Sequence, residues 1–199
     1  ILGRAAGITS YLLLVGLVLF GLVLSHPARA RWRRPSSATR IRGHVSLSVF
    51  TLAFTVLHIV VLATDTYAGV GWWGAFVPLG SSYRPVPVTL GVIGLYAGLA
   101  AGLTAAFSGR IARRVWWPVH KVAVVSFVLV WLHGVLAGID TPTLLSMYVI
   151  TGVAVLLLGV SRYTTPTQRD RVDELASVRA AELRAHGAGA VRDDGSVPR

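Results

Sequence analysis

Long apolar runs alternate with short polar segments along most of the chain. Five runs span residues 5–24, 43–63, 86–107, 115–139 and 143–160. A helix needs about 20 predominantly apolar residues to cross the hydrocarbon core of a bilayer, and each run is close to that length. The pattern therefore predicts an all-α integral membrane protein, with a bundle of five transmembrane helices in a domain at residues 1–163.

The overall composition also favours a lipid environment. Hydrophobic residues make up 54% of the 199 residues and charged residues only 14%, with a mean hydropathy of +0.65. A soluble domain carries about 25% charged residues. The net charge of +11 does not indicate a nucleic-acid partner, because the basic residues lie between the apolar runs, where topology signals are found.

The polar segments between the runs differ in charge. The second segment carries Asp65 with Arg84, and the fourth carries Asp140. By the positive-inside rule, segments rich in arginine face the cytoplasm. We therefore expect a multi-pass protein of the cell membrane, with residue 1 outside and the C-terminus in the cytoplasm. The arginines concerned are Arg29, Arg31, Arg33, Arg34, Arg40, Arg42, Arg110, Arg113, Arg114 and Arg162.

Residues 65–85 are longer than a simple turn and contain aromatic side chains among glycines and prolines. Aromatic residues at this depth often form a belt at the membrane interface. A lid over a cofactor, or a docking surface, is the alternative interpretation. The aromatic residues are Trp72, Trp73, Phe76 and Tyr83.

The composition changes again after the fifth run, where residues 164–199 form a second region. Residues 167–186 mix acidic and basic side chains with a thin apolar stripe, which predicts a short cytoplasmic helix at or near the membrane surface. Residues 187–199 are predicted to be disordered. No glycine-rich dinucleotide-binding motif follows a predicted strand, so we expect no flavin or nicotinamide domain in this sequence.

Few residue types are available for chemistry. The chain has no cysteine and six histidines. The lack of cysteine excludes disulfides, iron–sulfur clusters, thiolate ligation of haem and cysteine-based zinc sites. Histidine is then the obvious metal ligand. His26, in the first Arg-rich segment, and His186, in the tail, are expected to be solvated.

The other four histidines lie within two predicted spans. His44 and His58 are 14 residues apart on the second span, and His120 and His133 are 13 residues apart on the fourth. These spacings correspond to about 21 Å and about 20 Å along a helix. Because the two spans run in the same direction, His44 faces His120 and His58 faces His133. The pattern predicts two b-type haems, each held by two imidazoles and stacked about 20 Å apart across the bilayer.

Alternatives to haem binding stay open for these histidines. Ionisable side chains inside membrane spans are rare and usually functional, but packing histidines, or a proton relay in a haem-free transporter, also match the pattern. A third class of function is a membrane anchor in which the four histidines are dispensable. On an ideal helix His120 and His133 point about 140° apart. The haem hypothesis therefore predicts a 3₁₀ segment or a bend in the fourth span.

Charged and small residues near the histidines are further candidates. Haem propionates are anions that nearby cations stabilise, so Lys121 and Arg84 are candidate cofactor-binding residues at the cytoplasmic and outer positions. For the arginines that flank the cytoplasmic position, topology is the stronger explanation. Gly91, Gly94, Gly98 and Gly102 line the third span, and Gly94-x3-Gly98-x3-Gly102 predicts a close-packing seam.

The pattern His44-x13-His58 with His120-x12-His133 resembles the ferric reductase-like transmembrane domain superfamily. That superfamily includes NADPH oxidases, ferric reductases and the haem-binding membrane subunit of the periplasmic methionine sulfoxide reductase system. The resemblance covers about residues 1–160 and implies two b haems held by these four histidines. Three short sequence motifs are also similar: Leu2-Gly3-Arg4, the segment from Asp65 to Trp72, and Ser82-Tyr83-Arg84-Pro85.

The resemblance also implies transmembrane electron transfer. The oxidases and iron reductases have six spans and a fused cytoplasmic FAD/NADPH module, whereas this chain has five predicted spans and no such module. We therefore expect an electron-transfer subunit of an oxidoreductase rather than a complete enzyme, with any flavin on a partner protein. The expected donor is a cytoplasmic flavoprotein or membrane quinol. The expected acceptor is extracytoplasmic: a partner reductase, ferric iron or oxygen.

Overall fold

The computed structural model describes residues 1–27, 36–166 and 168–193, and all regular secondary structure in these ranges is helical. Five of the helices, α1, α2, α4, α5 and α6, are long and apolar enough to cross a membrane. The predicted all-α architecture with five spans is therefore confirmed. In chain order the helices are α1 (Leu2–Ser25), α2 (Ser37–Thr64), α3 (Gly71–Phe76), α4 (Pro85–Ala106), α5 (Arg113–Ala137), α6 (Thr141–Thr164) and α7 (Gln168–Asp193).

Local signals set where the spans begin. α2 begins after Ser36, whose hydroxyl accepts a hydrogen bond from the backbone N–H of Thr39 at 3.2 Å, as N-cap serines commonly do. Proline lies in the first turn of α4 and of α6, where its missing N–H leaves no helical bond unmade. α2 begins before its apolar run and therefore includes Arg40. This extension keeps the backbone groups near the lipid boundary paired, and unpaired groups are unfavourable there.

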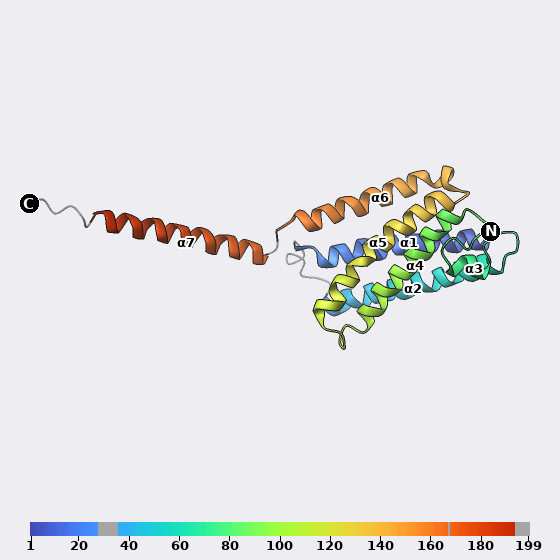
Figure 1. The fold of residues 1–199 in the computed structure, drawn as a ribbon, viewed down its shortest axis with the longest axis horizontal. Coiled ribbons are helices and arrows are strands. Elements are labelled where there is room, and N and C mark those ends of the chain that lie inside the picture. Colours follow the sequence, from blue (N-terminus) through green and yellow to red (C-terminus); the bar gives the residue numbers. More distant parts are fainter. Residues whose placement is uncertain (28–35, 167, 194–199) are drawn as a thin grey trace, which may run out of the picture.

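The five spans lie along the long axis of the molecule and alternate in direction (Figure 1). The N-terminus, α3 and the turn between α5 and α6 lie at one end, which we call the α3 end. The opposite end holds the start of α2, the turn between α4 and α5, and the last residues of α1 and α6. We call it the Arg-rich end, and α7 continues from it. Its described arginines are Arg40, Arg42, Arg110, Arg114 and Arg162.

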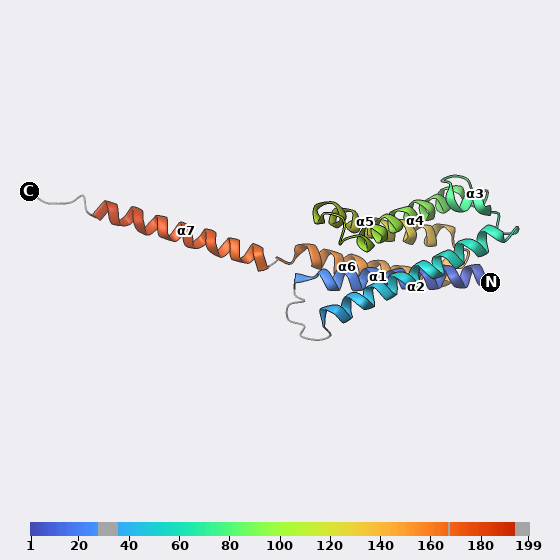
Figure 2. The same cartoon turned by 90° about the horizontal axis from the view of Figure 1, so that it is seen from below.

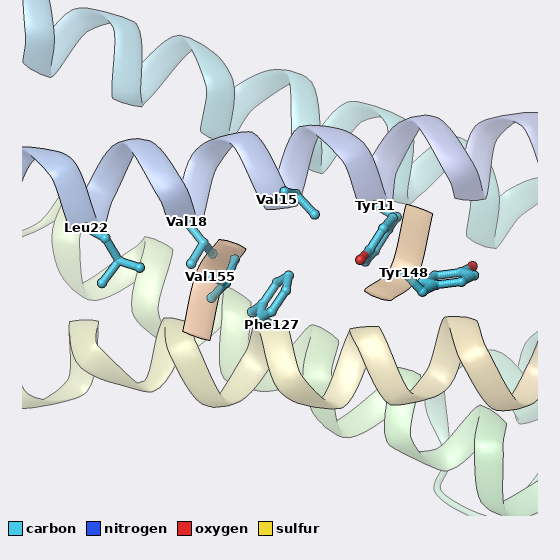
Figure 3. Packing of buried hydrophobic residues seen from close by; sticks show 7 residues of the cluster. All are labelled: Tyr11, Val15, Val18, Leu22, Phe127, Tyr148 and Val155. Atoms are coloured by element: carbon cyan, nitrogen blue, oxygen red, sulfur yellow. The ribbon is translucent and has the colours of Figure 1, made fainter. Parts of the chain in front are cut away.

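The spans pack as two antiparallel pairs, α1 along α2 and α4 along α5, and α6 packs against α1 and α5. Figure 2 shows α4 and α5 in a layer above α1, α2 and α6. A cluster of buried residues from α1, α5 and α6 joins the two layers (Figure 3). It consists of Tyr11, Val15, Val18, Leu22, Phe127, Tyr148 and Val155.

Polar contacts within this cluster hold α6 in place. The hydroxyl of Tyr11 is hydrogen-bonded to that of Thr151, and the indole N–H of Trp131 donates to the Tyr148 carbonyl at 2.9 Å. The rings of Tyr11 and Tyr148 are 5.1 Å apart. α1 therefore contacts α2, α5 and α6, so it connects the α1–α2 pair with α5 and α6.

The segment between α2 and α4 contains the short helix α3, which contacts both of them. Trp72, Trp73 and Phe76 are 53%, 70% and 41% exposed, and the rings of Trp72 and Phe76 stack with centroids 6.4 Å apart. The interfacial belt stays a prediction. In the fold, α3 bridges α2 and α4 at their shared end.

The C-terminal helix is longer than predicted. α7 continues to Asp193, so residues 187–193 are helical, and the prediction of disorder is wrong for them. Ala188 and Ala190 favour helix and offset the low helix propensity of the neighbouring glycines. Residues 194–199, the remainder of that prediction, lie outside the described residues. His186 belongs to α7.

The membrane orientation can be tested by cysteine labelling, because the chain has no native cysteine. Tyr67 is 100% exposed at the α3 end, and a Cβ at Gly109, between α4 and α5, would meet no atom within 4 Å. An impermeant maleimide should label Tyr67→Cys in intact cells but not Gly109→Cys, because the Arg-rich end is expected to face the cytoplasm. Both should react after lysis. Labelling of only Gly109→Cys in intact cells would reverse the orientation.

Candidate functional site

A large cavity lies between the α1–α2 pair and the α4–α5 pair. Its volume is about 1660 Å³, above the roughly 300–1,000 Å³ of an ordinary small-molecule site. The cavity extends from Arg40 and Lys121 at the Arg-rich end to Tyr67 and Tyr83 at the α3 end, and most of its lining is apolar. The structure brings all four predicted histidines to its wall: His44, His58, His120 and His133.

His44 and His120 form a pair at the Arg-rich end. Their ring centroids are 6.3 Å apart and the ring planes are inclined at 74°. Two imidazoles that bind one metal ion from opposite sides, through metal–nitrogen bonds of about 2 Å, have centroids roughly 6 Å apart. The separation therefore fits two axial ligands of a single iron. The rings of Trp116 and Trp117 lie 6.0 Å and 6.4 Å from that of His120 and flank the pair.

His58 and His133 form the second pair, at the α3 end. Both side chains line the cavity. His58 belongs to α2 and His133 to α5, so each of these two helices contributes one imidazole to each pair. This arrangement follows from the parallel direction of α2 and α5, which brings residues at equal depth together.

Three of the four imidazoles are hydrogen-bonded to a backbone carbonyl of the preceding helix. A carbonyl oxygen can only accept, so the proton must be on Nδ1, and Nε2 keeps its lone pair available as a ligand. Metal-binding histidines are commonly oriented by such a bond. The bonds run from His58 to Gly3 at 2.9 Å, from His133 to Pro87 at 2.8 Å and from His120 to Ala101 at 3.4 Å.

His44 differs from the other three histidines. Its Nδ1 is buried, and among the described residues it has no hydrogen-bond partner. Its ring lies against α1, where a Cβ on Gly21 would approach Cε1 to 3.2 Å. The two pairs are therefore unequal in how firmly the protein orients their imidazoles.

The spacing of His120 and His133 is accommodated without a change of helix type. α5 is α-helical from Arg113 to Ala137, with Pro118 inside it. The predicted 3₁₀ segment is therefore absent from α5, and the alternative, a bend, stays a prediction. Both imidazoles instead reach the same neighbouring helix, α4, and Ser126 donates to the Gly94 carbonyl at 2.7 Å between them. The bond of His120 is the longer of the two, 3.4 Å against 2.8 Å.

Glycines allow the imidazoles to approach the helix backbone. A Cβ on Gly7 would lie 2.8 Å from Cε1 of His58, and one on Gly91 would lie 2.8 Å from Nδ1 of His133. Sequence reasoning missed the glycines of α1. The available signal is their spacing, because Gly7 and Gly21 are 14 residues apart, as are His44 and His58 on the antiparallel partner helix.

The predicted glycine seam of α4 has more than one environment. A Cβ on Gly94 would meet Val130 at 2.9 Å, and one on Gly98 would meet Ser126 at 2.9 Å, so both positions pack closely on α5. Gly91 underlies His133 instead. Gly102 lines the cavity, and a Cβ there would meet nothing within 4 Å.

The two predicted cationic candidates lie in different places. Lys121 lines the cavity beside His120, with Nζ 5.9 Å from the centre of the Trp117 ring. Arg84 is absent from the cavity lining, and its guanidinium donates to the Leu136 carbonyl at 2.6 Å. That carbonyl belongs to the last turn of α5, where no further helical N–H can pair with it. Arg84 therefore satisfies a helix terminus in this structure.

Other charged groups reach the cavity that were not predicted from the sequence to bind a cofactor. Arg40 and Arg162 line it at the Arg-rich end, and Arg4 and Asp140 line it at the α3 end, where they form an ion pair at 2.9 Å. His26, expected to be solvated, is half-buried at the cavity wall, with Nε2 3.1 Å from the hydroxyl oxygen of a serine in α6.

Comparisons of the sequence with protein-family models and with curated proteins, and of the structure with solved structures, find no match. Among the described residues, no three His, Cys, Asp or Glu side chains gather closely enough to hold a bare metal ion. The donor sets at the two levels are pairs of imidazoles. A pair of imidazoles matches a metal ion whose other four coordination positions are occupied by a macrocycle, as in haem.

The glycine contacts give a test that needs no cofactor. Gly91→Ala should lower thermal stability in detergent, because overpacking costs about 1–3 kcal/mol, more than the up to about 1 kcal/mol that alanine gains over glycine in a helix. Gly102→Ala, on the same helix and cavity wall, should be neutral or stabilising because its added methyl meets open space. Equal melting temperatures for the two variants would contradict the contact between His133 and Gly91.

Proposed function

We propose that the chain carries electrons across the membrane through two b-type haems, each bound by one histidine of α2 and one of α5. The observation that supports this proposal best is the facing of His44 and His120, whose rings are 6.3 Å apart at the wall of a cavity of about 1660 Å³. The second pair, His58 and His133, lies on the same two helices at the α3 end of that cavity.

The hydrogen bonds of the imidazoles support the proposal independently of the pairing. Histidines that serve only to pack membrane helices need no more than a hydrogen-bond partner for each ring nitrogen. Here Nδ1 of His58 and of His133 donates to a carbonyl at 2.9 Å and 2.8 Å. This arrangement leaves Nε2 of each ring as a lone-pair donor at the cavity wall.

A bis-histidine haem exchanges single electrons and has no open position for a substrate. The residues of this chain supply the rest. The four imidazoles hold and orient the two sites at fixed depths, the apolar lining excludes water between them, and the glycines of α1 and α4 let the imidazoles lie close to the backbone. Lys121 is available at the cavity wall to bind an anionic propionate near His120.

The proposed role is that of an electron-transfer subunit in an oxidoreductase of the ferric reductase-like type. The Arg-rich end would face the cytoplasm and receive electrons from a flavoprotein or from membrane quinol, with flavin on the partner protein only. The α3 end would deliver them to an extracytoplasmic acceptor or partner reductase. The exposed aromatic residues of α3, Trp72 and Trp73, lie at the end where such an acceptor would dock.

Haem stoichiometry tests the proposal. The purified chain should show a Soret band and approach two b haems per chain by pyridine haemochrome analysis. His44→Ala and His120→Ala should each remove the same haem, and His58→Ala and His133→Ala the other, because a ligand cannot bridge the roughly 20 Å between levels. The haem that survives in each variant is recognised by its redox midpoint.

His26→Ala is the matched control for these variants, because His26 is a histidine of the cavity wall that belongs to neither of the two proposed pairs. This variant should retain both haems. A pure, folded protein without a Soret band would favour the haem-free transporter with a histidine proton relay. A ratio firmly at one haem per chain would leave only one of the two proposed sites.

A further inference from the structure

Two consecutive residues in front of α4 bind the end of α5. The hydroxyl of Tyr83 donates to the Ala137 carbonyl at 2.7 Å, and the guanidinium of Arg84 donates to the Leu136 carbonyl at 2.6 Å. Carbonyls in the last turn of a helix have no helical N–H to pair with. The Arg84 guanidinium also lies 5.5 Å from the centre of the Tyr83 ring, so each side chain supports the position of the other. We call Tyr83 and Arg84 the α5 staple.

A third hydrogen bond joins the same two helix ends. His133 lies one turn before the two stapled carbonyls, and its Nδ1–H donates to the carbonyl of Pro87 at 2.8 Å. Pro87 is in the first turn of α4, directly after the staple. The three bonds therefore connect residues 83–87 with residues 133–137. How these two segments lie against each other decides whether the imidazole of His133 meets its acceptor.

The backbone of Arg84 is strained where the staple forms. Its φ of 39° and ψ of 67° are left-handed, a conformation that is unfavourable for a residue with a Cβ. Successive side chains of an extended segment point to opposite sides, so the left-handed turn at Arg84 allows two neighbouring side chains to reach the same helix. Strained residues persist where the surrounding structure holds them, and they gather at functional sites.

The segment that carries the staple is itself fixed in place. The backbone N–H of Tyr83 donates to the Gly69 carbonyl at 3.2 Å, and the hydroxyl of Ser82 donates to the same carbonyl at 2.7 Å. The hydroxyl of Ser81 donates to the Tyr83 carbonyl at 2.9 Å. The staple therefore holds α5 from a fixed support.

We infer that Tyr83 and Arg84 are positioning residues for His133. By holding the last turn of α5 against the first turn of α4, they set the direction in which this imidazole enters the cavity. Partners of this kind, behind a metal ligand, fix the orientation of its ring. The inference rests on the proposed function and adds two residues that act through an axial ligand. Arg84, predicted from the sequence to bind a propionate, thus serves the same site from outside the cavity.

Electron paramagnetic resonance of the oxidised, purified full-length chain tests this role, because the low-spin signal of a bis-histidine haem depends on the orientation of its two imidazole planes. The signal of the α3 end is the one that His58→Ala and His133→Ala remove. Tyr83→Phe and Arg84→Met should each shift or split this signal, because the bond that fixes the His133 ring is disturbed. Both variants should keep two haems and leave the signal of the other pair unchanged. Arg84→Lys, which keeps a cationic donor, should give the native spectrum.

Thr141→Val is the matched control. The hydroxyl of Thr141 also donates into the last turn of α5, to the Val135 carbonyl at 3.0 Å, but it belongs to α6. Like Tyr83→Phe, this variant deletes one hydroxyl from the helix end, yet it leaves the connection to α4 in place. Both haem signals should stay native. Equal changes in Thr141→Val and Tyr83→Phe would show a general loosening of the helix end and would overturn the inference.

Hydrogen exchange gives a readout that needs no cofactor. In Tyr83→Phe and in Arg84→Met, the backbone amides of residues 134–138 should exchange about fivefold faster, as expected when one hydrogen bond of this kind is lost. The increase should appear in the chain with or without haem. Unchanged exchange in both variants would show that the staple does not hold this turn, and the inference would fail.

The remaining outcomes separate the inference from the proposed function. Two bound haems with a native α3-end signal in both Tyr83→Phe and Arg84→Met would overturn the inference and leave electron transfer standing. Protein that shows the expected exchange but binds no haem would overturn the proposed function, and with it the role of the staple in positioning a ligand.

Discussion

An imidazole N–H inside a lipid bilayer has no water to bind, so it is costly to leave it without an acceptor in the protein. In this chain His58, His120 and His133 meet that requirement with a carbonyl of the preceding helix. The contact requires close approach of ring and backbone, and Gly7 and Gly91 make it feasible. The direction in which these three imidazoles face follows from this constraint.

The cavity follows from the way in which the two helix pairs are joined. Membrane helices gain little from burying apolar surface against each other, so contact depends on close packing and on polar bonds. α1 supplies such contacts to α5 and α6 through Tyr11 and Val15, whereas α2 packs mainly on α1. The space between α2 and the α4–α5 pair is therefore lined by side chains from both sides. Its size is what makes a large flat cofactor a reasonable occupant.

Arginine at one end of the bundle has more than one role. Arg42 and Arg114 are exposed, as expected of residues that set the topology, whereas Arg40 and Arg162 reach the cavity. Arg84, at the other end, satisfies a carbonyl of α5 rather than facing the cavity. Proximity to a histidine in the sequence thus does not decide whether a cation lies near its ring, because neighbouring residues on a helix point in different directions.

The five spans, their alternating direction and the matched depths of the four histidines could be predicted from the sequence alone. These features follow from the length of the apolar runs and from the constant rise per residue of an α-helix. A segment that crosses lipid adopts regular helix because its backbone groups must pair with each other. Three other features emerge only from the folded bundle. They are the carbonyl that each imidazole meets, the α-helical conformation of α5 between His120 and His133, and the position of Lys121 rather than Arg84 at the cavity wall. Those outcomes depend on the rotation of each helix about its own axis and on the close contacts of its neighbours. Neither is encoded in the spacing of residues along a single span.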